Sequence, residues 1–390
     1  MHWTRTKRLI AVLIIIVVAV LLLVRRIIHY HSEETDLVHQ LQQRGVFLSK
    51  VWSKCFHATM DYKDKALEHS DGKNQDDGIQ KRKHCKVGFI PQNGACVACP
   101  QGTFALEQWA VCTPLLTCNE LSHHGVQVGN PLYSVGNWRF RAARWNNYDV
   151  LYALLSADDN TAFDFEPVQR LLPHDNLLYP IGLCDREEKT ELLFAWSNDV
   201  LGHADKLDLI LACKTDCDNE IGRFKLAIDF IRILVHLHSN KTGNGRPLVL
   251  CNSHSLPLLL SQFLITDDLR LVLGAFDNLP ALKNTDEGSK EAKVKCSQRE
   301  LKGSFVSPEQ RWPYQSSKVF NPVQQPGYTE KSDIWKIPDI TRALLSTGGE
   351  NILDLLEVTH RKCKNREPSG RPTAIQVLQE YQFVWDIVIS

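Results

Sequence analysis

The chain has 390 residues, and its 45 Lys and Arg residues balance 45 Asp and Glu residues, so the formal net charge is zero. This balance excludes the basic surplus that nucleic-acid binding proteins usually carry, and no nucleic-acid partner is expected. A hydrophobic content of 43% and a charged content of 23% are those of a globular protein, which excludes wholesale disorder. The length allows about two or three folded units.

An apolar segment lies close to the N-terminus. Residues 9–24 are uninterrupted apolar residues, with arginines on both sides. At about 1.5 Å per residue, a helix of this run is a little shorter than a hydrocarbon core of about 30 Å, and the flanking arginines can reach the interfaces. The run predicts a transmembrane helix over residues 9–28 that anchors the chain in the lipid bilayer. A cleaved signal peptide is the alternative, although no small-residue cleavage site follows.

Five cysteines cluster after a polar stretch: Cys85, Cys96, Cys99, Cys112 and Cys118. The Cys-x-x-Cys pair formed by the second and third could be half of a zinc site. A zinc site would need a second close pair, and the last two cysteines are spaced too widely. The cluster therefore favours disulfides, which form in oxidising compartments and place this part of the chain in a lumen.

The rest of the chain can then be divided. Residues 1–8 are expected to be a short cytosolic N-terminus, and residues 29–84 a lumenal stalk and linker. Residues 85–119 form the cysteine-rich segment, and residues 120–390 alternate strand-like and helical runs. A glycosylation sequon at Asn240 agrees with a lumenal location.

The long C-terminal part reads as an α+β domain. Residues 221–237 carry apolar residues at helical spacing on most faces, which predicts a buried helix. Residues 148–155 and 190–197 look like strands. Two apolar runs flank Thr-Asp-Asp at residues 266–268 and predict a hairpin.

Motifs of a protein kinase follow that helix in order. The chain places a loop at 251–257, the hairpin, and then Ala275-Phe-Asp277, which resembles the catalytic loop and metal-binding segment of kinases. Ser-Pro-Glu309 resembles the end of an activation segment. Asp333-Ile-Trp resembles the start of a buried kinase helix, ended by the glycines at 348 and 349, and Arg371-Pro-Thr the late motif whose arginine pairs with that glutamate. The resemblance implies a two-lobed protein kinase-like fold with a Glu309–Arg371 ion pair.

The match is closer than the kinase superfamily. The chain resembles the protein O-mannose kinase family over roughly residues 96–390, on segments 99–121, 256–262, 294–303, 307–314 and 330–340. The resemblance implies a type II membrane protein of the endoplasmic reticulum with a lumenal kinase domain. It would transfer the γ-phosphate of ATP, with Mg²⁺ or Mn²⁺, to the 6-position of O-linked mannose in a GalNAc–GlcNAc–Man trisaccharide on dystroglycan.

The chain departs from this family at the positions that handle phosphate. Asn252 occupies the position of the catalytic aspartate, and an amide cannot accept the hydroxyl proton. Ala275 replaces the first metal-binding aspartate, whereas the second remains as Asp277, and Gln262 occupies a second ligand position. One carboxylate together with phosphate oxygens can hold Mg²⁺ weakly.

The phosphate-binding loop is altered as well. Gly136 is the surviving glycine of the family's Gly-x-Gly, and Arg139 supplies a positive charge where the family has a lysine. These departures leave the enzymatic activity open. The alternatives are a pseudokinase that binds the glycan or a glycosylation enzyme without transferring phosphate, and a cytosolic-facing signalling pseudokinase with a zinc-binding cysteine cluster.

Overall fold

The structure is a computed structural model that describes residues 85–389 with gaps at 123–124, 136–137, 157–165, 187–188, 196–199, 213–217, 240–245, 252, 277–278, 284–291, 297–298, 315–317 and 347. The expected transmembrane helix over 9–28 and the expected stalk lie outside the described residues. Among the helices within them, none combines the length and apolar composition that a membrane crossing requires.

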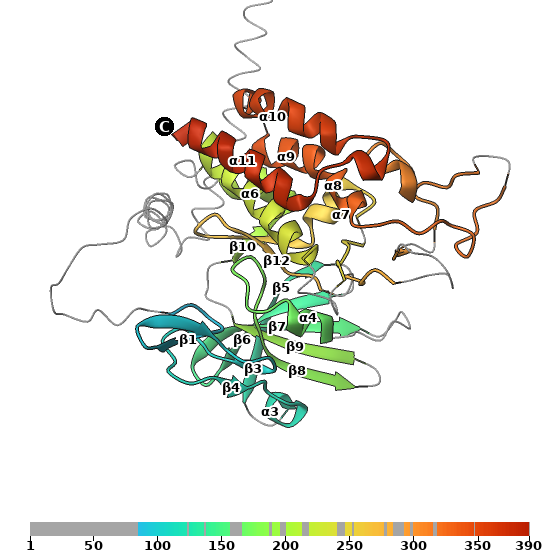
Figure 1. Ribbon diagram of the computed structural model, residues 1–390. Helices are drawn as coiled ribbons and strands as arrows, with labels where there is room; N and C mark the ends of the chain where they lie inside the picture. Colours follow the sequence, from blue (N-terminus) through green and yellow to red (C-terminus); the bar gives the residue numbers. More distant parts are fainter. Residues whose placement is uncertain are drawn as a thin grey trace, which may run out of the picture. The chain divides into compact units, whose positions relative to one another are not determined.

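An antiparallel five-stranded sheet has the order β5-β6-β7-β9-β8 (Figure 1). Its strands are β5 (Val126–Val135), β6 (Trp138–Trp145), β7 (Tyr148–Ser156), β8 (Pro180–Arg186) and β9 (Lys189–Ala195). The strands predicted at 148–155 and 190–197 are confirmed as β7 and β9. Both are rich in the β-branched, aromatic and leucine side chains that fill a pleated, buried surface.

The central strands of this sheet are buried on both faces. On one face, Leu151 and Phe194 belong to the main core, which includes the large helices. On the other face, Val150 and Leu193 belong to a second core that includes Phe104 of the cysteine-rich segment. Alternation of side chains along a strand explains how adjacent residues reach different cores.

The cysteine-rich segment is built from short elements joined by disulfides. It contains β1 (Phe89–Gln92), β2 (Ala95–Ala98), β3 (Thr103–Phe104), β4 (Thr113–Pro114) and α3 (Cys118–Ser122). The predicted disulfides are present as Cys85–Cys96, Cys99–Cys112 and Cys118–Cys184. The two cysteines of the Cys-x-x-Cys pair therefore have separate partners, and the third bridge joins α3 to β8.

Main-chain contacts attach this segment to the sheet. The amide of Leu116 donates to Ile181 O at 2.9 Å, and the amide of Leu183 donates to Leu116 O at 3.0 Å. Gly182 lies between these bonds, and a Cβ there would come within 2.9 Å of the Leu116 Cβ. Only glycine allows the two chains to approach this closely.

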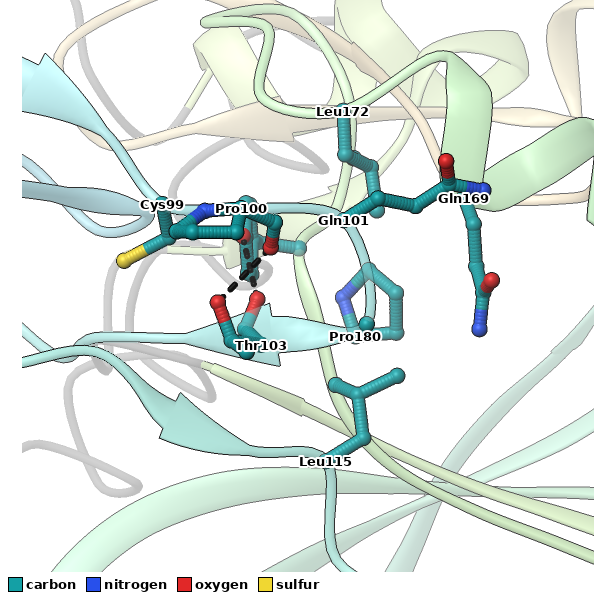
Figure 2. Close-up of a pocket in the computed structure, with 10 residues that line it drawn as sticks. Cys99, Pro100, Gln101, Thr103, Leu115, Gln169, Leu172 and Pro180 are labelled. Carbon is teal, nitrogen blue, oxygen red and sulfur yellow. Dashed lines mark hydrogen bonds between the residues drawn. The ribbon is translucent and has the colours of Figure 1, made fainter.

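A recess lies where the segment meets the sheet (Figure 2). Its lining includes Pro100 and Thr103 from the segment, Gln169 from α4 (Glu166–Arg170), and Pro180 from β8. The hydroxyl of Thr103 donates to Pro100 O at 2.7 Å, as the dashed line shows. The lining carries no charged side chain, so we do not assign phosphoryl chemistry to it.

A smaller antiparallel sheet has the order β10-β11-β12. It consists of β10 (Val200–His203), β11 (Phe263–Thr266) and β12 (Leu271–Leu273), and α5 (Leu207–Ala212) follows β10. The hairpin predicted around residues 266–268 is confirmed as β11 and β12. Strand β12 also contacts the residues that precede β8, because the Leu273 amide donates a hydrogen bond to Asn176 O at 2.9 Å.

Further helices follow the five-stranded sheet in sequence, and one of them is buried among the others (Figure 1). They are α6 (Glu220–Leu237), α7 (Leu256–Leu260), α8 (Lys331–Ile334), α9 (Ile337–Leu345), α10 (Glu350–Cys363) and α11 (Ala374–Ile389). The helix predicted at 221–237 is confirmed as α6. Asn219 caps its N-terminus by accepting from the Gly222 amide at 2.7 Å, and α6 packs against α9, α11 and β12.

The helix expected from Asp333 to the glycines at 348 and 349 differs in detail. It starts at Lys331 as α8, is interrupted at Trp335–Lys336, and resumes as α9, with Pro338 in the first turn. Helix α9 ends at Leu345 because Ser346 has φ of 54°. The mixture of helix and strand agrees with the predicted α+β class.

Candidate phosphoryl-transfer site

The loop that precedes α7 is the centre of the candidate site. Cys251 and Ser253 are both buried, at 5% and 4% exposure, and flank position 252. Asn252 itself, together with the other predicted site residues Gly136, Asp277 and Asn240, lies outside the described residues. Their assigned roles therefore stay predictions.

Asp333 of α8 holds the N-terminal side of this loop. Its carboxylate is buried, and Oδ2 accepts a hydrogen bond from the Leu250 amide at 3.1 Å. The same oxygen lies 3.2 Å from Nε2 of His238, at the end of α6. A buried carboxylate needs such partners to offset its loss of hydration, so α6, α8 and the loop are joined at one point.

Glu309 and Arg371 form the ion pair that the sequence predicted. Nη1 and Nη2 of Arg371 donate to the two carboxylate oxygens of Glu309 at 2.6 and 2.8 Å. Arg371 is 3% exposed and also donates to the carbonyls of Asn365 and Lys331. This two-point pairing fixes the segment around Pro308–Gln310 against the residues before α11.

A disulfide joins the loop to the segment that leads to Glu309. Cys251 pairs with Cys296, 45 residues later. The bridge borders a recess lined by Ser253, His254, Cys296, Arg299, Leu301, Gln310 and Tyr328. The recess thus contains Ser253 and His254, which follow position 252 in the sequence.

His254 and Arg299 meet at this recess. Their Nε2 and Nη2 atoms are 2.7 Å apart. Burial lowers the pKa of His254, and the positive charges of Arg299 and Lys336 lower it further. The neutral imidazole therefore accepts a hydrogen bond from the guanidinium, which holds a cation beside position 252.

The described part of the metal segment is apolar. Ala275 and Phe276 are 2% and 3% exposed, and Phe276 stacks on Phe194 of β9 at 6.0 Å. Gln262 is buried, and its amide nitrogen donates to Cys251 O at 3.5 Å. No group of three or more His, Cys, Asp or Glu side chains that could hold a metal ion occurs in the described parts of the chain.

Strand β6 carries Arg139, which the sequence placed near the ATP phosphates. Trp138 and Phe140 are buried in the main core, whereas Arg139 is exposed. Alternation along the strand puts Arg139 on the face of the sheet opposite to that core. Its role toward phosphate stays a prediction, and the geometry does not bring it to the loop at Cys251–Ser253.

Comparison with known proteins identifies the family. No protein-family model matches the chain. The protein O-mannose kinases of Homo sapiens and Gallus gallus are 34% and 31% identical over 297 and 298 residues, which is 74% and 75% of this chain and 81% of each relative. The chain belongs to the protein O-mannose kinase family. The protein O-mannose kinase of Xenopus laevis is also 31% identical, over 299 residues. The fold is accordingly the kinase-like α+β fold of protein O-mannose kinases.

One buried residue at the site was missed from the sequence. Lys336 is 1% exposed, and its Nζ lies 2.5 Å from Ser253 Oγ, next to position 252. The available indication was a lysine inside the apolar run Ile334-Trp-Lys-Ile, where a surface lysine is not expected. The general kinase motif Asp-Ile-Trp singles out Asp333 and assigns no role to the lysine three residues later.

Proposed function

We propose that this chain is an ATP-dependent kinase of O-mannosyl glycans. Its acceptor is the 6-hydroxyl of mannose in a GalNAc–GlcNAc–Man trisaccharide on a dystroglycan-like glycoprotein. The observation that carries the proposal is the convergence of Asp333, Glu309–Arg371 and the Cys251–Cys296 bridge around one loop, in a chain of the protein O-mannose kinase family. Motif order alone does not require these distant segments to meet.

The reaction is a phosphoryl transfer in which few protein groups act on bonds. The mannose hydroxyl oxygen forms a bond to the γ-phosphorus, the bond from that phosphorus to the bridging oxygen breaks, and ADP leaves. Asn252 can orient the hydroxyl, but its proton must pass to water. In a loose transition state the hydroxyl is still largely protonated, so positioning carries much of the rate. We expect a slow kinase because Asn252 supplies no base for that proton.

The nucleotide and a divalent cation would use the remaining phosphate-handling positions. We assign Asp277 and Gln262 to Mg²⁺ or Mn²⁺, and Gly136 with Arg139 to the ATP phosphates. The cation, when bound, would neutralise phosphate charge. Of Asp277 and Gln262, the structure describes only Gln262, and its amide nitrogen donates to Cys251 O in the loop. No step is therefore derived through the metal.

We place the protein in the endoplasmic reticulum membrane as a single-pass type II protein. The proposed anchor is the helix over residues 9–28, and the kinase-like domain faces the lumen with a glycan on Asn240. Three disulfides in and beside the cysteine-rich segment, and a fourth at the site, support an oxidising compartment. Treatment of the expressed chain with an endoglycosidase should increase its mobility on a gel, and Asn240→Gln should abolish that shift.

The test of the kinase function uses the full chain, purified in detergent. It is incubated with ATP, Mg²⁺ or Mn²⁺ and the synthetic trisaccharide, and the sugar is weighed by mass spectrometry. We expect a phosphate adduct that Asp277→Ala abolishes and that Asp354→Ala, an exposed carboxylate on α10, leaves unchanged. A sugar that stays unmodified with either cation contradicts the proposal.

A second candidate function has its own observation. Ala275 stands buried where the family has a carboxylate, and it belongs to the same main core as Trp138, Phe140 and Phe276. This packing favours a glycan-binding pseudokinase. Binding of the trisaccharide without phosphate transfer in the same experiment would select that function.

A further inference from the structure

Lys336 is a buried cation at the junction of α8 and α9. It is 1% exposed, and a charge in such a place costs several kcal/mol unless it is paired and hydrogen-bonded. Burial lowers its pKa, while the charge of nearby Asp333 raises it. The partners of its ammonium group therefore decide what the residue does.

Those partners are one serine and one carboxylate. Nζ donates to Ser253 Oγ at 2.5 Å and lies 3.7 Å from Oδ1 of Asp333. The Ser253 hydroxyl in turn donates to Leu250 O at 2.7 Å. Because a hydroxyl has one proton, accepting from Lys336 leaves that proton for Leu250, and both bonds are satisfied together.

The turn from Asp333 to Lys336 thus holds the loop at Leu250 and at Ser253. Asp333 binds the Leu250 amide, and Lys336, three residues later, binds the Ser253 side chain. The Lys336 amide donates to Asp333 O at 3.0 Å where α8 is interrupted, and this turn brings both side chains to the loop. Only two residues, Cys251 and the one after it, lie between the held positions.

We propose that Lys336 is a positioning residue of the phosphoryl-transfer site, which fixes the loop between Leu250 and Ser253 by holding Ser253. The proposal rests on the proposed kinase function for its effect on rate. Lys336 is buried, and it acts on the loop through the hydroxyl of Ser253. A displacement of about 1 Å at a reacting group can reduce a rate about 100-fold.

The experiment compares Lys336→Met, which removes the donors at similar volume, with Ser253→Ala, which removes their acceptor. We expect kcat to fall about 10- to 100-fold in each, with KM for ATP and trisaccharide within about twofold. The double variant should be no worse than either single variant, because both break one connection. Ser253→Thr, which keeps the hydroxyl, should restore most of kcat.

Ser261→Ala is the matched control. Its hydroxyl also donates to the carbonyl three residues earlier, Leu258 O, at 2.9 Å, but among the described residues no lysine donates to it. We expect wild-type kcat and wild-type hydrogen exchange from this variant. Peptides that cover residues 250–254 should exchange amide hydrogens faster in Ser253→Ala and Lys336→Met than in Ser261→Ala.

Two results would overturn the proposal. One is a Ser253→Ala variant with wild-type kcat and wild-type exchange at 250–254, whether or not Lys336→Met folds. The other is a lower melting temperature with kcat unchanged, which marks a purely structural lysine. If the wild-type chain transfers no phosphate, the kinase function fails, and the exchange comparison between Ser253→Ala and Ser261→Ala alone decides whether Lys336 positions the loop.

Discussion

The helices after residue 300 and the five-stranded sheet use charged side chains differently. Among the helices, Arg371, Asp333 and Lys336 are buried and paired. On the sheet, the face toward the main core carries Trp138 and its aromatic neighbours, and the arginines of β6 are exposed.

A kinase sequence contains residues that stabilise the fold and residues that bind phosphate, and this contrast separates the two groups. A buried ion pair is tied to the fold, because removing one partner leaves an uncompensated charge. A phosphate-binding residue is tied only to a ligand, and its replacement need not disturb packing. The chain can therefore keep a kinase framework while its phosphate-handling residues change.

The largest effect is expected from restoring one of the altered phosphate-handling residues. Asn252→Asp supplies a carboxylate that can accept the hydroxyl proton, and we expect kcat to rise about 10²- to 10⁴-fold. The mass-spectrometric assay with the trisaccharide measures it, with Asp354→Asn as the control. An unchanged rate would mean that the limit lies in nucleotide or metal binding and not at position 252.

Arg371→Met tests how much the buried ion pair between Glu309 and Arg371 stabilises the fold. The change strands the carboxylate of Glu309, and we expect the free energy of unfolding to fall by about 3–5 kcal/mol in urea denaturation. Arg342→Met is the control, because its side chain is 64% exposed and lies 3.9 Å from Asp339. That variant should lose no more than about 1 kcal/mol, and equal losses would contradict the distinction.

The disulfide between α3 and β8 tests how firmly the cysteine-rich segment supports the sheet. Cys118→Ser with Cys184→Ser opens a loop of 66 residues and should cost about 2–4 kcal/mol by thermal or chemical unfolding. The pair Cys85→Ser and Cys96→Ser opens a loop of only 11 residues. A larger loss from the shorter loop would show that native packing, and not chain entropy, dominates.

The smallest effect appears only on acidification. Burial lowers the pKa of His360 from 6.5 to about 4, and its Nε2 contacts the Tyr381 hydroxyl at 2.7 Å. Between those values the unfolded chain binds the proton and the folded chain does not, so stability should fall as the pH drops from about 6.5 to about 4. His360→Gln should flatten this slope in unfolding measurements. His174, whose pKa is also lowered to about 4, leaves a residual slope. An unaltered slope would contradict the assignment.

Sequence patterns could predict the elements whose side chains repeat along the chain. The apolar spacing at 221–237 sufficed for α6, and two motif residues sufficed for the Glu309–Arg371 pair. Disulfide partners could not be predicted, because cysteine spacing permits many pairings and packing selects one. Lys336 was missed because its role depends on a serine 83 residues away in sequence.

The bridge between Cys251 and Cys296 closes a covalent ring of chain. A protease that cuts once inside this ring produces two fragments that stay joined through sulfur and migrate apart only after reduction. Order–disorder switching of the activation segment, as in kinases that phosphorylation turns on, is restricted here because Cys296, between Asp277 and Glu309, is joined to Cys251 of the loop before α7.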